Sequence, residues 1–383
     1  MQTIKITDFY DEFRPYNETE ALEAVKRISG NKRFKQLIHY FFPNLDDKGY
    51  IQLMNSVKSI NDFQMKIMHQ ITDRVIEKTI TKLNVSGLEN IAKDKHYVFI
   101  SNHRDIVLDA TLFEYLLADN DFRTTEITFG NNLMEDPLVF DIGKTNKMFK
   151  VYRKGTPKEL LKKTLQLSEY IRYTVFNKRE SVWIAQRGGR TKNGDDKTHS
   201  GILKMLNASG TKSFEANMKE LNIVPISVSY EFEPNDHLKV NELLNTVNGK
   251  YTKKEGEDIN SIIDGTCSNK GNVHIAIGKP INSQLNILKT ISRTNEKVKK
   301  LGEIIDSEIY RNYNLFPNNF IAYDLLNDSD KFQTYYSKSQ KNNFISYKKE
   351  QLTKISDFSK KAKSLYLDIY ANPVININKL QYF

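Results

Sequence analysis

The sequence predicts an α/β domain that is extended by helices at both ends. Between about residue 84 and residue 285, short apolar runs rich in β-branched and aromatic residues recur, and turn residues follow them. Stretches with helical spacing lie between these runs. Outside this region the apolar residues recur mainly at three- and four-residue steps, which is typical of amphipathic helices. We therefore expect a helical region over 1–83, an α/β domain over 84–285 and a second helical region over 286–383.

Both helical regions carry local signals. Asn17 and Glu20 are expected to cap the start of a helix. The longest helical pattern of the amino-terminal region runs over 56–83. The carboxy-terminal region carries two apolar stripes, one beginning near Val298 and the other near Leu352. We expect both regions to pack on the middle domain, and contact of the amino-terminal apolar face with lipid is the alternative that the sequence leaves open.

Seven segments of the middle region have strand character, and one long segment has helical spacing. The helix is expected over 157–173, where leucines recur on one face. The expected strands cover residues 84–91, 97–100, 124–129, 149–154, 181–185, 221–230 and 272–280.

The composition limits the class of protein. With 383 residues, 39% hydrophobic and 11% aromatic, the chain can bury a large core. The net charge of +10 is compatible with nucleic acid, an anionic membrane surface or an acidic carrier protein as partner. Most aromatic residues fall on apolar helix faces rather than among basic residues, so we do not expect nucleic acid. The single cysteine, Cys267, excludes an internal disulfide and fits a reducing cytoplasm.

The sequence also predicts the kind of membrane contact and whether a metal site is present. It contains no uncharged apolar stretch of about 18 residues, and its first residues lack the apolar core of a signal peptide. Any membrane contact is therefore expected to be peripheral. The seven histidines have no metal-ligand spacing, so no metal site is expected.

A histidine follows one predicted strand directly, and two carboxylates come soon after it. His103 lies just beyond the run 97–100, and helical spacing resumes at Ile106. Ligands of α/β sheets bind at this edge. A neutral imidazole can accept a proton from an attacking hydroxyl, which is worth roughly 10²–10⁴ in rate, and a carboxylate can hold its other nitrogen protonated. We expect a general base at His103 partnered by Asp109 or, alternatively, Asp105. A surface histidine beside an Asp105 helix cap is the plainer alternative.

Two basic segments suggest a site for phosphate or for anionic lipid. Residues 144–163 hold eight lysines and arginines, and an exposed basic residue gains about 1 kcal/mol beside anionic lipid. The segment 186–194, called the basic loop below, follows the strand 181–185 and interleaves glycines with Arg187, Arg190 and Lys192. Freed backbone N–H groups and guanidinium groups suit a phosphate monoester. A solvated basic face is the alternative for the first segment, and a generic basic turn is the alternative for the second.

Taken together, these segments resemble the glycerophospholipid acyltransferase superfamily, which includes the glycerol-3-phosphate and lysophosphatidic acid acyltransferases. His103 with its following aspartate is similar to the family's His-x-x-x-x-Asp box. The turn 130–133 resembles the second block, Gly-x-Asn-Leu, and the strand that contains Pro225 resembles the fourth. The basic loop resembles the third block, Phe-x-Glu-Gly-Thr-Arg-Ser-Arg-x-Gly, with Arg190, Lys192 and Gly194 in register. The four blocks occur in the family's order.

The chain departs from the family pattern at two places. The fifth residue after His103 is Leu108, and Asp109 comes one residue later. A one-residue insertion before the helix could restore the geometry. The glutamate of the third block falls on Arg187, and the neighbouring Gln186 offers a hydrogen bond but no charge. This second departure affects the expected class of acceptor.

The resemblance implies a fold, a reaction and a set of site residues. The fold is a mixed sheet flanked by helices. The reaction moves a fatty acyl group from an acyl carrier protein or coenzyme A thioester to a hydroxyl, commonly on a glycerol phosphate, at the cytoplasmic face of a membrane, with no metal or redox cofactor. His103 would act as base, oriented by Asp109. Acceptor phosphate would bind Arg153, Arg190, Lys192 and Arg187, and the acceptor or oxyanion loop would involve Asn132, Gly188 and Gly189.

Two other functions remain open on the sequence. One is an acyltransferase that uses another lipid acceptor, such as an aminolipid, because the third block is altered. The other is a basic membrane-surface protein without catalytic activity on the same scaffold.

Overall fold

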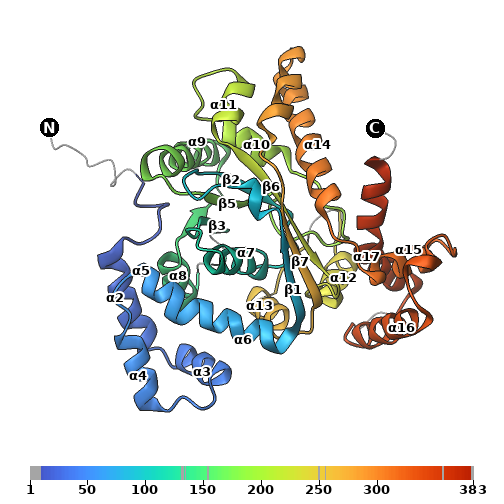
Figure 1. The fold of residues 1–383 in the computed structure, drawn as a ribbon, viewed down its shortest axis with the longest axis horizontal. Coiled ribbons are helices and arrows are strands. Elements are labelled where there is room, and N and C mark those ends of the chain that lie inside the picture. The colour runs from blue at the N-terminus through green and yellow to red at the C-terminus, as the bar shows by residue number, and fades with distance from the viewer. Residues whose placement is uncertain are drawn as a thin grey trace.

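A computed structural model describes residues 10–130, 133, 135–152, 155–248, 251–254, 256–355 and 358–380. Its centre is one seven-stranded sheet in the order β1-β7-β6-β2-β5-β3-β4, with helices on both faces (Figure 1). The strands from β6 to β4 run parallel to one another, whereas β7 and β1 run antiparallel to β6. The predicted mixed sheet flanked by helices is confirmed. The strands are β1 (Ile80–Ser86), β2 (Val98–Ser101), β3 (Glu126–Gly130), β4 (Met148–Val151), β5 (Val182–Ala185), β6 (Ile223–Tyr230) and β7 (Gly271–Ile277).

Helices make up most of the remaining structure. A turn of π-helix, Phe63–Met68, joins α5 to α6, and 3-10 turns connect several other elements. None of the helices in the described part of the chain is long and apolar enough to cross a bilayer. The helices are α2 (Glu18–Ser29), α3 (Lys32–Phe41), α4 (Asp47–Asn55), α5 (Ile60–Asp62), α6 (His69–Thr79), α7 (Leu108–Asp119), α8 (Pro137–Thr145), α9 (Pro157–Tyr173), α10 (Ser200–Asn207), α11 (Phe214–Glu220), α12 (Asp236–Leu244), α13 (Glu257–Cys267), α14 (Thr294–Asn312), α15 (Pro317–Leu326), α16 (Lys338–Thr353) and α17 (Lys360–Leu380).

The central strands are buried on both faces, which is why they are almost continuously apolar. Alternate residues point to opposite sides. Phe99 and Trp183 join the core beneath α6 and α7. Val98 and Val182 join the core beneath α9, α10 and α14. The sheet is thus the middle layer of the domain, and its strand ends are the edges at which side chains reach open space.

The amino-terminal helices follow the predicted signals except at the two ends of the longest one. Asn17 and Glu20 form a capping box at the start of α2, as predicted. The expected helix over 56–83 is wrong at both ends, because α5 begins only at Ile60, and α6 stops at Thr79, where the chain enters β1 at Ile80. The helical spacing of the apolar residues continues past this point, but parallel pairing with β7 determines the conformation.

The carboxy-terminal helices form a third core that is docked beside the sheet. Helices α15, α16 and α17 pack around Tyr366 and Tyr370, together with Val240 of α12. Both tyrosines donate hydrogen bonds to the buried Asp236 carboxylate, at 2.6 and 2.8 Å. The same region reaches the basic loop, where the Asn372 side chain donates to the backbone carbonyl of Asn193 at 2.7 Å.

The basic segment 144–163 does not form one exposed surface, contrary to the simplest expectation. Lys144 is buried, and burial lowers its pKa to about 8. Lys147 pairs with Glu180 at 2.8 Å, and Lys163 pairs with Glu12. Exposed lysines of this segment are found on α9 instead, at positions 158 and 162. Packing of the segment against the amino-terminal residues and against Glu180 accounts for the difference.

Candidate active site

The site lies at the carboxyl ends of β2 and β5, which are neighbouring parallel strands. The Gln186 backbone N–H donates to the Ser101 carbonyl at 2.8 Å, which extends the ladder by one step. The Thr191 N–H then donates to the His103 carbonyl at 2.7 Å. These two bonds hold the basic loop against the histidine loop. Sheet topology therefore brings together two segments that lie far apart in the sequence.

His103 is paired with Asp109. The histidine Nδ1 lies 3.0 Å from the Asp109 Oδ2, and His103 is only 9% exposed. Because a carboxylate only accepts hydrogen bonds, Nδ1 carries the proton in this pair and the basic nitrogen of the neutral ring is Nε2. Nε2 has no hydrogen-bond partner among the described residues. The geometry can therefore support proton abstraction by His103.

The Asp109 carboxylate is fixed by four donors in total. Besides the imidazole, its Oδ2 accepts from the backbone N–H groups of Arg104 and Asp105, at 2.6 and 2.9 Å. Its Oδ1 accepts from the Tyr230 hydroxyl, at the end of β6, at 2.9 Å. The loop after His103 thus folds around the carboxylate, and the extra residue of the His–Asp spacing is accommodated there, before α7 begins at Leu108.

Asp105 makes different contacts. Its Oδ1 accepts from the backbone N–H groups of Val107 and Leu108, at 3.0 and 2.9 Å. Its Oδ2 accepts from the Asn235 side chain at 3.0 Å. The structure therefore places Asp105 at the start of α7 as a capping group and leaves Asp109 against the imidazole.

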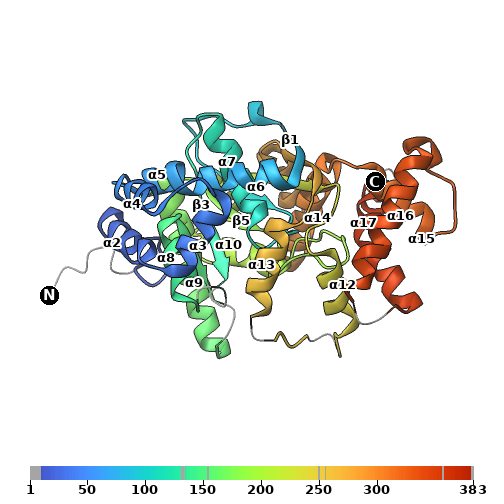
Figure 2. The same cartoon turned by 90° about the horizontal axis from the view of Figure 1, so that it is seen from below.

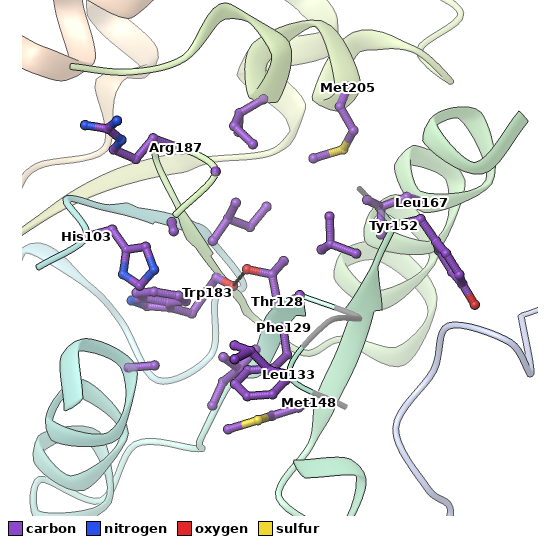
Figure 3. Close-up of a pocket in the computed structure, with 18 of the residues that line it drawn as sticks. His103, Thr128, Phe129, Leu133, Met148, Tyr152, Leu167, Trp183, Arg187 and Met205 are labelled. Carbon is purple, nitrogen blue, oxygen red and sulfur yellow. Dashed lines mark hydrogen bonds between the residues drawn. The ribbon is translucent and has the colours of Figure 1, made fainter. Parts of the chain in front are cut away.

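A mostly apolar pocket of about 270 Å³ opens beside His103 (Figure 3). His103 and Trp183 lie on one side of it, with ring centroids 6.3 Å apart. Helix α9 contributes Leu167 to the opposite side and α10 contributes Met205. Arg187 of the basic loop lies at its polar edge. Such a pocket suits a flexible apolar chain whose reactive end lies at the imidazole.

The cations of the basic loop lie deep rather than on the surface. Arg190 is 6% exposed, its Nη1 is buried without a partner in the described structure, and its Nη2 lies 3.4 Å from the Ser261 hydroxyl of α13. Lys192 pairs with Glu242 of α12. Burial and the nearby Arg190 charge lower the pKa of Lys192 to about 7, although Glu242 acts in the opposite direction. An anion that entered here would meet desolvated donors.

The acyltransferase family model matches residues 82–229 of this chain. This part of the chain is an acyltransferase domain. The match runs from β1 almost to the end of β6, so it contains His103, Asp109 and the basic loop. The resemblance drawn from the sequence blocks is confirmed at the level of the family.

Comparison with solved structures finds the 1-acyl-sn-glycerophosphate (LPA) acyltransferase PlsC from Thermotoga maritima. The similarity covers 77% of this chain and 95% of that chain, at 15% identity and a TM-score of 0.36. No curated protein sequence matches the chain.

The basic loop of the acyltransferase domain presents free backbone donors. The N–H groups at positions 187, 188, 189 and 190 donate to no acceptor among the described residues, whereas those of Gln186 and Thr191 are bonded. Gly189 has a φ of +82°, a conformation that favours glycine. Successive free N–H groups of this kind form an anion-binding concavity, so the loop can hold an oxyanion or a phosphate oxygen.

A pair of glycine variants tests whether this loop conformation matters. A Cβ added at Gly188 or at Gly189 would meet no atom within 4 Å, and only Gly189 has a positive φ. Gly189→Ala is therefore expected to destabilise the loop by about 1 kcal/mol and to lower kcat/KM several-fold, because alanine disfavours this backbone region. Gly188→Ala serves as the matched control and should behave like the parent protein in urea unfolding and in turnover. Equal effects of the two variants would contradict the prediction.

A buried ionic cluster that the sequence analysis did not predict lies beside the site and joins the acyltransferase domain to the residues that follow it. Arg104, directly after the histidine, donates from Nε and Nη2 to Asp196 at 3.0 and 2.6 Å. Its Nη1 lies 3.4 Å from Glu233, which also accepts from Lys239 at 2.6 Å. The Arg104 guanidinium is fully buried, and the Asp196 charge keeps its pKa well above the usual range despite desolvation. The adjacency of Arg104 to His103 was the only sequence signal for this cluster.

Two predicted site residues cannot be placed. Asn132 of the second block and Arg153 of the basic segment lie outside the described residues. Among the residues that the structure does describe, no group of three or more histidine, cysteine or acidic side chains could hold a metal ion.

Proposed function

We propose that this protein transfers a fatty acyl group from an acyl carrier protein or coenzyme A thioester to a hydroxyl of a glycerol-phosphate-type lipid acceptor. The observation that carries the proposal is the buried His103–Asp109 pair, at 3.0 Å, which lies at an apolar pocket and beside the loop that holds Arg187 and the buried Arg190. The pocket would take the acyl chain and the cations would take the acceptor phosphate. No metal or redox cofactor enters the proposed reaction.

The proposed chemistry uses His103 twice. Its Nε2 takes the proton from the acceptor hydroxyl while the hydroxyl oxygen attacks the thioester carbonyl carbon. Asp109 stabilises the imidazolium that forms and keeps the ring in the productive tautomer. The free N–H groups of the basic loop would stabilise the oxyanion of the tetrahedral intermediate. Collapse of this intermediate breaks the carbon–sulfur bond, and the imidazolium returns the proton to the leaving thiolate.

The acceptor side of the proposal rests on Arg190, Arg187 and Lys192. The Nη1 of Arg190 and the Nε of Arg187 are buried and have no partner among the described residues. A buried guanidinium with unused donors costs free energy unless a ligand satisfies them, so the site suits a bound phosphate oxygen. The proposed reaction would take place at the cytoplasmic surface of a membrane, where both the lipid acceptor and the product would lie.

One observation favours a second candidate, transfer to a lipid acceptor that carries an amino group. Glu242 already pairs with Lys192, which neutralises one of the three cations. A carboxylate at this position could bind an ammonium group and would repel a phosphate dianion. Glu242 is therefore the residue that distinguishes the two acceptor classes.

An acyl-transfer assay tests the proposal. The purified protein would receive labelled acyl carrier protein or acyl-coenzyme A with a panel of glycerol phosphate, lysophosphatidate and lyso-aminolipid acceptors, and His103→Ala would be the control. Product on a phosphate acceptor supports the first candidate, and product only on an aminolipid supports the second. If the protein gave no product with any combination, the non-catalytic scaffold would replace both.

Arg190 provides a specific prediction about the acceptor. Arg190→Met is expected to raise the KM for a phosphate acceptor by roughly tenfold to a hundredfold, because a charge-assisted hydrogen bond is worth about 1.5–3 kcal/mol, and to leave the KM for the thioester unchanged. Lys197→Met is the matched control, since Lys197 lies just beyond the basic loop, is exposed and, among the residues that the structure describes, pairs only with Asp195. An equal rise in the thioester KM would assign Arg190 to the donor instead.

A further inference from the structure

Helix α9 exposes two leucines that the fold leaves uncovered. Leu161 and Leu165 are 71% and 42% exposed. They lie four residues apart, so they form one stripe on the helix. Lys158 and Lys162 lie on the same face and are also exposed. No ion pair joins either lysine to a described residue, whereas Lys163, on the neighbouring face, pairs with Glu12.

The other face of α9 forms a wall of the apolar pocket. Lys163, Thr164 and Leu167 all line that pocket. The exposed leucines are therefore only one helix width from the space in which the proposed acyl chain would lie. An acyl chain or a lipid acceptor that reaches the pocket across this helix would pass from the leucine stripe to the pocket wall.

Helix α13 shows a similar pattern on the other side of the site. Ile259 and Ile263 are 40% and 56% exposed and lie four residues apart. The same helix reaches the basic loop, because its Ser261 hydroxyl lies 3.4 Å from Arg190. Figure 2 shows α9 and the α12–α13 segment projecting from the same, lower side of the molecule. Both exposed apolar pairs thus belong to helices that contact the site and that project in one direction.

We propose that this α9/α13 face is a docking surface for a bilayer that contains anionic phospholipid. The face consists of Lys158, Leu161, Lys162, Leu165, Ile259 and Ile263. Apolar side chains interleaved with unpaired lysines match the surface of such a bilayer. The leucines would enter the acyl region just below the headgroups, and the lysines would contact the headgroup charge. The proposal rests on the proposed function in one respect, that a lipid-handling pocket opens beside the docked helix.

Vesicle sedimentation tests this surface directly. The probes are vesicles of mixed phosphatidylcholine and phosphatidylglycerol, with the full-length protein. Leu161→Glu/Leu165→Glu is expected to lower the partition coefficient at least about tenfold, because two apolar side chains no longer enter the bilayer. Lys158→Gln/Lys162→Gln should lower it about fivefold per lysine at low salt, and this difference should shrink as salt rises. Ile259→Glu/Ile263→Glu gives an independent test from the second helix.

A matched control comes from the amino-terminal helices. Leu37 on α3 and Ile51 on α4 are 40% and 56% exposed, so their exposure resembles that of the α9 pair. Leu37→Glu/Ile51→Glu should bind vesicles like the parent protein. A loss confined to this control would place the membrane contact on the amino-terminal helices and overturn the proposal. Parent-like vesicle binding by both the α9 and the α13 variants would also overturn it.

The assay separates this proposal from the proposed function. Leu161→Glu/Leu165→Glu should keep the parent's rate with a water-soluble short-chain acceptor and donor, and lose rate only with acceptor embedded in vesicles. If the parent protein shows no transfer activity at all, sedimentation still reports on the surface. If the α9 variant retains vesicle binding but loses transfer only from acyl carrier protein, the face binds the acidic carrier and the bilayer proposal is wrong.

Discussion

His103→Ala is expected to lower kcat by roughly 10²–10⁴, the range that a positioned general base contributes. The imidazole lines the pocket while Asp109 holds its Nδ1 at 3.0 Å. The measurement is the steady-state rate with saturating thioester and acceptor. Folding should be retained, since the substitution removes a side chain that lines an open pocket. His199→Ala is a suitable control, because His199 follows the basic loop and is held through its backbone N–H. Turnover by His103→Ala at the parent rate would eliminate this mechanism.

Substitutions of Asp109 and Asp105 test the same mechanism independently. Asp109→Asn should also lower kcat by a factor of roughly 10²–10⁴, because a neutral amide neither stabilises the imidazolium nor fixes the imidazole tautomer. Asp105→Asn keeps the oxygen that caps α7, and asparagine is as good a cap as aspartate, so its kcat should fall less than about tenfold. The reverse ranking would assign the base partner to Asp105.

Arg104→Met is expected to be the most destabilising single substitution of the site, by about 3–5 kcal/mol in the free energy of unfolding. Arg104 and its partners Asp196 and Glu233 are all almost fully buried. Removal of the guanidinium leaves two buried carboxylates with a single ammonium group, that of Lys239. Urea unfolding of the variant measures the loss.

Two further variants make this prediction specific. Arg104→Met/Asp196→Asn removes one charge of each sign and should recover part of the stability, because Glu233 and Lys239 then remain balanced. Arg293→Met removes an arginine from an exposed pair with Glu296 and should cost less than about 1 kcal/mol. A loss below about 1 kcal/mol for Arg104→Met would mean that water reaches the cluster.

Much of the domain follows from local sequence. The strand at 181–185 and the helix at 157–173 are predicted almost to the residue, because buried parallel strands and amphipathic helices have distinct apolar patterns. The capping box of Asn17 and Glu20 is likewise a local interaction. The family of the central domain is also a sequence property, since its blocks occur in order along the chain.

Local patterns fail where a partner distant in sequence determines the outcome. The residues after Thr79 keep helical spacing and yet form β1, because they pair with β7, nearly two hundred residues away. The basic segment 144–163 looks like one charged surface, and tertiary packing buries Lys144 and pairs Lys147 and Lys163 with acidic residues. Charge in the sequence does not reveal which charges the fold covers.

By itself, the sequence determined that this chain carries an acyltransferase domain and that a histidine ends one of its strands. It left two aspartates as partners of that histidine, because spacing alone does not fix the path of a loop. The tertiary structure placed Asp109 against His103 and Asp105 at the helix start, through contacts with backbone amides and with Tyr230 of a distant strand. The buried cluster around Arg104 likewise draws on separate segments. Hydrogen bonds between such segments form only once the sheet has brought the strand ends together.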